Sequence, residues 1–193
     1  MHVTIPPMSV LQSPLTTLTI RSATPSDYEI CLEIDHSCST DYVWQMLLEE
    51  TEGTFTTSFR QARLPRSTKV LYPRSGEALI QSWQLHSCFL VAEWEEQLVG
   101  YVSIREELSQ ETAWATDLIV DRPHRLKGVG TTLLRASREW ALERHLRRLI
   151  IETQTKNFPA ISFLQKHGLV FCGYNDLYYP NHDIAVFFGQ TLR

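Results

Sequence analysis

The sequence predicts a single α/β domain built around one mixed β-sheet, and three observations support this. The chain has 193 residues, a length that suits one domain with a full hydrophobic core. Hydrophobic residues make up 43% and charged residues 21%, close to the averages of globular proteins. Strand-like and helix-like patterns follow one another in the order β-α-α-β-β-β-α-β-α-β-β, which is typical of helices packed on a central sheet.

Hydrophobic periodicity, together with turn and capping residues, places the elements along the chain. Strands are expected at 15–21, 88–94, 98–105, 111–120, 149–153, 169–174 and 184–188, and helices at 24–34, 41–50, 128–145 and 157–167. Asn157 is a good N-cap and Gly168 a good residue to end the last helix. The organisation of residues 51–86 stays open, because two prolines and mixed polarity obscure the pattern.

The start of the chain differs from the rest. Residues 1–14 contain three prolines and few charges, so we expect a flexible N-terminal arm, with the domain at 15–193. The arm lacks the pattern of a secretory signal, and no apolar run approaches the ~20 residues of a membrane helix. The four cysteines have no zinc-like spacing. These features favour a cytoplasmic protein with no metal site and no membrane partner.

A glycine-containing loop before the long helix is the most informative motif. Residues 125–130 read Arg-Leu-Lys-Gly-Val-Gly. The first turn of a helix has unpaired amides and a positive dipole end, and glycine lets the backbone approach a diphosphate closely. Arg125 and Lys127 add positive charge, and Thr131 can donate a hydroxyl. Taken alone, the two glycines could instead form an ordinary tight turn before a helix, with no ligand.

In its context this loop resembles the Arg/Gln-x-x-Gly-x-Gly/Ala pyrophosphate loop of the GNAT family of N-acetyltransferases, also called GCN5-related. A second block matches the fourth helix of that family and consists of Asn157, Ala160, Phe163, Lys166 and Gly168. A third group looks like the streptothricin acetyltransferase branch and comprises Glu152, Thr153, Gln154, Asn157, Gly173, Asp176 and residues 184–188. The resemblance spans about residues 17–188.

The resemblance implies a GNAT fold: a mostly antiparallel sheet with helices on both faces, whose fourth and fifth strands (111–120 and 149–153) splay apart. It implies acetyl-CoA as the cofactor, held in the splay with its pyrophosphate on the loop. The residues it assigns to coenzyme A are Leu118, Ile119, Val120, Arg125, Leu126, Lys127, Gly128, Val129, Gly130, Thr131 and Asn157. Asn157 can equally serve as a plain helix cap.

The resemblance also implies direct attack of a primary amine on the thioester, which requires a base and a route for the leaving thiolate. Asp117 and Glu152 lie on the two splayed strands and are candidate bases; structural, hydrogen-bonded carboxylates are the alternative for each. The family usually has a tyrosine acid where this chain has Leu164, which has no proton to give. Tyr178 is the candidate replacement, with ordinary packing as the alternative.

Charge and composition limit the partners. The net charge is −4 and there is no basic run, so we expect no nucleic-acid partner, and a mild acidic excess favours a cationic acceptor. The acceptor can be a small molecule, including a streptothricin-like antibiotic, or a protein amine. The oligomeric state is left open, and a homodimer is one possibility. An alternative function is a catalytically weak or inactive acyl-CoA sensor, because the usual tyrosine and the usual strand-four glutamate are both missing.

Overall fold

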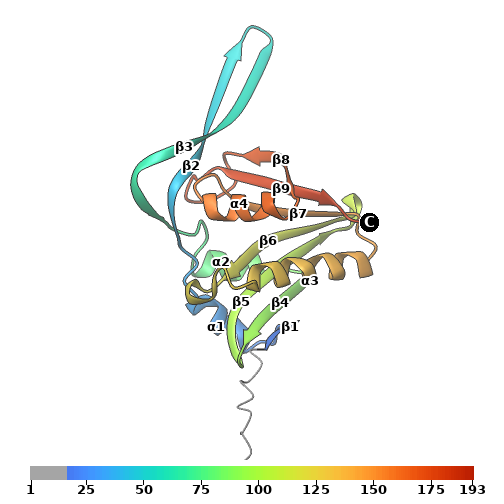
Figure 1. Ribbon diagram of the computed structural model, residues 1–193. Helices are drawn as coiled ribbons and strands as arrows, with labels where there is room; N and C mark the ends of the chain where they lie inside the picture. The colour runs from blue at the N-terminus through green and yellow to red at the C-terminus, as the bar shows by residue number, and fades with distance from the viewer. Residues whose placement is uncertain (1–16) are drawn as a thin grey trace, which may run out of the picture.

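The computed structural model describes residues 17–193, so the arm predicted at 1–14 and the first two residues of the strand predicted at 15–21 lie outside it. Seven strands form one sheet in the order β1-β4-β5-β6-β7-β9-β8 (Figure 1). They are β1 (Leu18–Ser22), β4 (Cys88–Trp94), β5 (Gln97–Glu107), β6 (Thr112–Val120), β7 (Arg148–Gln154), β8 (Val170–Asn175) and β9 (Ala185–Thr191). Among the described strands only β6 and β7 pair in parallel. The prediction of a mixed, mostly antiparallel sheet is confirmed.

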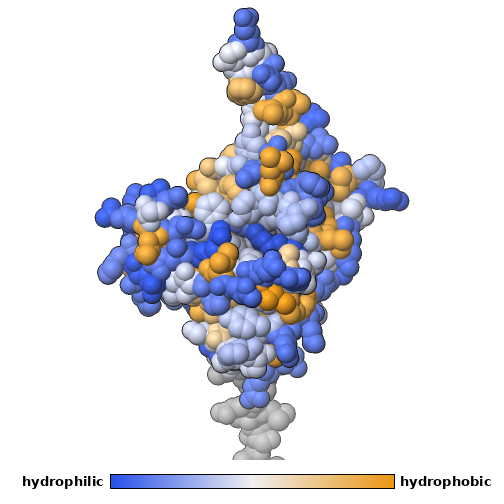
Figure 2. All heavy atoms as spheres, turned by 180° about the vertical axis from the view of Figure 1, so that it is seen from behind, coloured by the Kyte–Doolittle hydropathy of each residue, from blue (hydrophilic) through white to orange (hydrophobic). Residues whose placement is uncertain are grey.

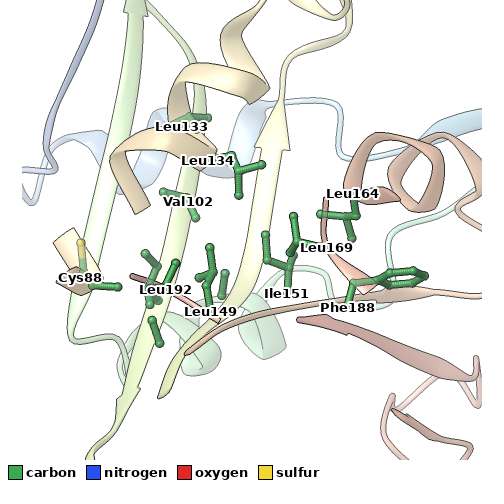
Figure 3. Packing of buried hydrophobic residues seen from close by; sticks show 14 of the residues in the cluster. Cys88, Val102, Leu133, Leu134, Leu149, Ile151, Leu164, Leu169, Phe188 and Leu192 are labelled. Atoms are coloured by element: carbon green, nitrogen blue, oxygen red, sulfur yellow. The ribbon is translucent and has the colours of Figure 1, made fainter. Parts of the chain in front are cut away.

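Helices cover both faces of the sheet, as predicted. On one face, α3 (Val129–Glu143) and α4 (Phe158–Lys166) form a core that includes Leu133, Leu134 and Leu164 (Figure 3). On the other face, α1 (Asp27–Glu33) and α2 (Glu77–Trp83) form a second core that includes Cys31 and Trp83. The apolar stripes of the helices therefore bury against opposite sides of one sheet.

From residue 88 onward the predicted elements are confirmed, with boundaries that differ by a few residues. The strand predicted at 88–94 is β4, and Glu95 and Glu96 both have positive φ angles in the tight turn that follows it. Two consecutive residues of this kind suit the right-handed twist of a hairpin. The periodicity of the strands was a reliable guide here because each strand has a buried face.

The helix predicted at 41–50 is wrong. These residues belong to β2 (Cys38–Thr51), which pairs antiparallel with β3 (Thr54–Val70) in a long hairpin that extends away from the body (Figure 1). The run from Met46 to Glu50 consists of good helix formers, but pairing with β3 satisfies its backbone and overrides that local preference. Gly53, with φ of +74°, closes this hairpin rather than a helix. The second helix of the predicted order is α2, inside the segment left open.

A β-bulge between β5 and β6 sets the direction of two functional side chains. Ser103 pairs with Asp117 while the next residue, Ile104, pairs with Ala115, so Thr116 is an extra residue in β6. Without the bulge, the alternation of a strand would direct Trp114 and Asp117 to opposite faces. With it, both side chains lie on the face that α1 and α2 cover.

Candidate active site

The two parallel strands at the centre of the sheet diverge part-way along their length. β6 and β7 pair only over 112–115 and 148–151. Beyond this, β6 stays paired with β5 and β7 stays paired with β9. The splay predicted for these two strands is therefore confirmed, and it opens a gap in the middle of the sheet.

A hollow lies where the strands separate, with a volume of about 450 Å³ counting its open mouth. Its walls come from β6, β7 and α4, and from the segments that carry Tyr72 and Tyr179. Among the predicted site residues, Leu118, Ile119, Glu152 and Asn157 line it. Leu164 also lines it, so an apolar side chain occupies the position where the family usually has its acid.

The glycine loop leads from β6 into α3 and leaves a row of backbone amides free. Leu126 has φ of +63° and Gly128 has φ of +92°, and left-handed residues of this kind help to turn neighbouring amides toward one side. Outside α3 itself, no backbone carbonyl or side chain among residues 17–193 accepts a well-aligned hydrogen bond from the amides of 126–131. The positive end of α3 adds to these donors. The loop can therefore hold an anionic group such as a diphosphate.

The side chain of Arg125 is bound to backbone rather than free for a phosphate. Its Nε donates to the carbonyl of Val120 at 2.8 Å, and its two Nη atoms donate to the carbonyls of Ser37 and Asp35, each at 2.7 Å. It thus fastens the glycine loop to the segment between α1 and β2. Its cofactor-binding role stays a prediction, and the geometry favours positioning of the loop over direct contact.

The remaining predicted cofactor residues surround the same loop. Lys127 Nζ lies 5.8 Å from the centre of the Trp94 ring, and Thr131 Oγ1 lies 3.0 Å from Nε2 of His167. Asn157 Oδ1 accepts a hydrogen bond from the amide of Ala160 at 3.2 Å. Its role as an N-cap is thereby confirmed, while its contact with a cofactor stays a prediction.

The two predicted carboxylates lie together, buried, with one arginine between them. Arg74 forms an ion pair with Glu152, and its Nη1 lies 3.5 Å from Oδ1 of Asp117. Both carboxylate side chains are 0% exposed, and that of Arg74 is 11% exposed. Burial opposes the charge of Arg74, but the nearby Glu152, Tyr72 and Asp117 outweigh it and raise the pKa of the guanidinium.

Uncharged donors complete the hydrogen bonding of both carboxylates. Glu152 Oε2 accepts from Trp114 Nε1 at 2.7 Å and from the hydroxyl of Tyr178 at 2.6 Å. Asp117 accepts from the hydroxyl of Tyr72 at 2.5 Å and from that of Thr116 at 2.9 Å. Hydrogen bonds of this kind stabilise the ionised form of a carboxylate. Burying an acid inside so apolar a strand is costly unless it is paired, and Glu152 is paired.

The tyrosines around the cluster keep their protons. Burial, and then the negative charge of Glu152, raises the pKa of Tyr178 and of Tyr179. The hydroxyl of Tyr178 donates a hydrogen bond to Glu152, whereas Tyr179 lines the hollow together with Leu164. The structure thus brings Tyr178 to the carboxylates, and its role as an acid stays a prediction.

Sequence reasoning missed Arg74 and Tyr72. Both lie just after β3, in the segment whose organisation could not be predicted, and no motif distinguishes them. A buried carboxylate on each of two neighbouring strands does imply that a cation lies nearby. Which residue supplies this cation depends on how the chain returns to the sheet after the hairpin, and the local sequence does not reveal that path.

Comparisons with known proteins agree with this geometry. A family model described as "Acetyltransferase (GNAT) family" matches residues 44–169. Streptothricin acetyltransferase A of Bacillus subtilis (strain 168) is 35% identical over 97 residues, which cover 48% of this chain and 56% of that protein. A streptothricin acetyltransferase of Streptomyces lavendulae is 26% identical over 169 residues, covering 85% and 87%. The chain thus spans little more than half the length of the Bacillus relative.

Solved structures share the fold. The crystal structure of nourseothricin acetyltransferase has a TM-score of 0.78 and 24% identity, covering 92% of this chain and 100% of that one. A structure from Bacillus anthracis str. Ames, in complex with acetyl coenzyme A, has a TM-score of 0.71 and 22% identity, covering 92% and 99%. At these identities the likeness concerns the fold alone.

The described residues, 17–193, contain no group of three or more His, Cys, Asp or Glu side chains that could hold a metal ion. None of their helices combines the length and the apolar character needed to cross a membrane.

Proposed function

The chain belongs to the GNAT acetyltransferase family, and from that premise we propose that it transfers an acetyl group from acetyl-CoA to a primary amine. One observation carries the proposal. The hollow in the splay between β6 and β7 is lined by Glu152, which is joined to Asp117 through Arg74, and by Phe163 of α4, which lies against Gly130 of the glycine loop. Binding of acetyl coenzyme A by a protein of the same fold supports the choice of cofactor.

The residues of the splay fit the parts of acetyl-CoA. The free amides of 126–131 suit the pyrophosphate, and the stretch of β6 that no longer pairs with β7, which contains Leu118, Ile119 and Val120, suits the acetyl and pantetheine groups. Asn157 lies beside the hollow at the start of α4. Bound there, the cofactor supplies a thioester, whose carbonyl carbon is the target of the amine.

The buried carboxylates suit the acceptor. Before it can attack, an ammonium group must be held beside the thioester and must lose a proton. Glu152 lines the hollow and Asp117 lies across Arg74 from it, so either can attract the ammonium and receive the proton. The amine nitrogen then forms a bond to the acetyl carbon as the carbon–sulfur bond breaks. Tyr178 holds the orientation of Glu152 through its hydroxyl.

For the acceptor we propose the streptothricin class, because the curated relatives are named streptothricin acetyltransferases. The test is an assay of coenzyme A release, with acetyl-CoA and streptothricin, and mass spectrometry of the acetylated product. Turnover with a protein amine but not with streptothricin would show that the acceptor is a protein and not the proposed antibiotic. Saturable binding of acetyl-CoA without turnover of any amine would favour the alternative function, a catalytically inactive acyl-CoA sensor.

Glu152→Gln is the variant that tests the chemistry. It keeps the shape of the side chain but removes the charge that faces Arg74, so we expect kcat to fall on the order of 10²-fold or more. Affinity for acetyl-CoA, measured by calorimetry, should change little, because the pyrophosphate loop is untouched. Trp114→Phe, which removes one hydrogen bond to Glu152 but no charge, serves as the control. An equal effect of both variants on kcat would contradict a role for the carboxylate in turnover.

We also propose that two copies pair through the β2–β3 hairpin. Leu48 and Phe55 lie on the same face of the hairpin as Phe59, which packs on β8, yet they are 52% and 73% exposed. Hydrophobic surface on this projection is visible in Figure 2. Glu50 near the tip and Arg63 further along β3 lie on this same face, and their opposite charges would meet if two hairpins lay antiparallel. A cytoplasmic location likewise remains a proposal, supported by the scattered cysteines.

A further inference from the structure

One histidine fastens the end of α4 to the first turn of α3. His167 follows α4, and its Nε2 lies 3.0 Å from Oγ1 of Thr131. Its ring centre lies 4.3 Å from that of Phe163, which in turn lies against Gly130 of the glycine loop. The guanidinium of Arg138 donates to the carbonyl of His167 at 2.8 Å. The ring of His167 is therefore held beside the loop whose free amides suit the diphosphate.

The hydrogen bonds of this ring fix the direction of its contact with Thr131. His167 Nδ1 lies 2.9 Å from the carbonyl oxygen of Phe163, and a carbonyl only accepts, so Nδ1 carries the proton. In a neutral imidazole the other nitrogen, here Nε2, is then an acceptor. The hydroxyl of Thr131 therefore donates its proton to Nε2 and has none left for a phosphate oxygen.

A second proton on His167 reverses this contact. Both nitrogens of an imidazolium donate, so Nε2 then donates to Oγ1 of Thr131, and the proton of Thr131 becomes free. Thr131 is exposed in the first turn of α3, beside the free amides, so its proton can reach an anion bound there. The imidazolium also brings positive charge close to the same anion.

The charged groups around His167 are mainly cations. Lys166 precedes it on α4, and Arg138 of α3 donates to its carbonyl. Arg135, also on α3, lies 3.8 Å from a carboxylate oxygen of Glu139. In the described part of the chain, no carboxylate forms an ion pair with His167. An imidazolium at this place therefore gains a counter-ion only when an anion occupies the loop.

We infer that His167 is a positioning residue of the cofactor site, which takes a proton from the solvent when the diphosphate binds and thereby turns the Thr131 hydroxyl toward it. Linkage is reciprocal, so diphosphate binding and protonation of His167 favour each other. Affinity for the cofactor should therefore rise as pH falls through the range in which histidine changes charge. This inference rests on the proposed binding of acetyl-CoA at the glycine loop.

The test is a calorimetric titration with acetyl-3′-dephospho-CoA, in buffers of different ionisation enthalpy, which measures the protons taken up on binding. This donor keeps the diphosphate but lacks the 3′-phosphate, whose own titration near about pH 6 would obscure the result. At about pH 6.5 the wild type should take up a fraction of a proton. Its affinity should be about tenfold higher at about pH 5.5 than at about pH 8.

Three variants locate the proton. His167→Gln keeps a polar side chain that cannot titrate, so proton uptake should fall and the affinity should stay near the wild-type value at about pH 8. Thr131→Val, which removes the hydroxyl, should shrink the pH dependence, whereas Thr131→Ser should retain it. His145→Asn is the matched control, because His145 is exposed beyond the far end of α3. Asparagine tolerates its left-handed conformation, with φ of +59°.

The outcomes separate two kinds of failure. If the wild type binds neither acetyl-CoA nor the dephospho donor, the proposed function fails. If it binds them but His167→Gln takes up as many protons as the wild type, His167 has only a structural role and the inference is overturned. Should His167→Gln not fold, Thr131→Val decides: a folded variant, shown by thermal unfolding, with an unchanged pH dependence would overturn the inference as well.

Discussion

Asp27 at the start of α1 is a buried carboxylate that Arg21, together with Thr24, holds in its charged form. Arg21 donates to both of its oxygens, at 2.7 and 2.9 Å, and the amide of Thr24 donates at 2.6 Å. The hydrogen bonds from Arg21, partly opposed by burial, hold the pKa of Asp27 well below its usual range. Its folded pKa is thus below its unfolded pKa of about 3.9.

We therefore expect Asp27→Asn to lower the free energy of unfolding by about 1–2 kcal/mol near neutral pH, a modest value because Arg21 is partly exposed to solvent. The contribution of Asp27 is present above its unfolded pKa and is lost as pH falls toward its folded pKa. The gap between variant and wild type should shrink as pH falls below about 4. Urea unfolding at a series of pH values measures it, and a gap that stays constant would contradict this account.

At the scale of the element, the glycine loop depends on a distant segment for its position. Arg125 ties it to the carbonyls of Asp35 and Ser37, and both of those residues line a hollow beside α1 and α2. The glycine loop and this hollow are thus joined by one side chain. A change at either end can reach the other through it.

Arg125→Met should weaken the binding of acetyl-CoA several-fold by releasing the loop, because the guanidinium fastens it through three backbone carbonyls. The diagnostic measurement is affinity, by calorimetry, at several salt concentrations. A charge that contacts phosphate makes binding depend on salt, whereas a positioning residue does so much less. Lys127→Met, at an exposed position of the same loop, is the comparison. A larger change in salt dependence for Arg125→Met than for Lys127→Met would show direct phosphate contact instead.

At the scale of the whole molecule, the β2–β3 hairpin is the least supported part. A two-stranded hairpin is only marginally stable in water by itself. Strand β8 supports it at one point, where the hydroxyl of Thr57, opposite Leu48 in the outer half of the hairpin, lies 2.8 Å from that of Tyr174. Leu48 and Phe55, on the same face, are nevertheless 52% and 73% exposed, and neither belongs to the two core clusters of the described residues.

If a second copy covers this face, the double variant Leu48→Ser with Phe55→Ser should convert a dimer to a monomer while leaving thermal unfolding of the body nearly unchanged. Sedimentation velocity over a range of concentrations measures the oligomeric state. Leu108→Ser is the control, because Leu108 is 72% exposed on a different part of the molecule. A monomeric wild type, or a variant that stays dimeric, would exclude the hairpin as the interface.

The sequence by itself determined the elements after residue 88, the glycine loop and the two carboxylates, because each depends on local chemistry. Strands with one buried face alternate, helix starts require caps, and a loop that binds a diphosphate requires glycine. Glu152 could be selected because a charged residue within an apolar strand is costly to bury unpaired, and Asp117 because the family resemblance places a carboxylate on that strand.

Tertiary structure alone decided the rest. Residues 41–50 form a strand because β3 pairs with them, which outweighs the helix preference of their side chains. Trp114 and Asp117 share a face because one extra residue enters β6 opposite β5. Arg74 reaches both carboxylates because the chain returns to the sheet after the hairpin. Each outcome depends on a partner far away in the sequence, and local periodicity carries no information about that partner.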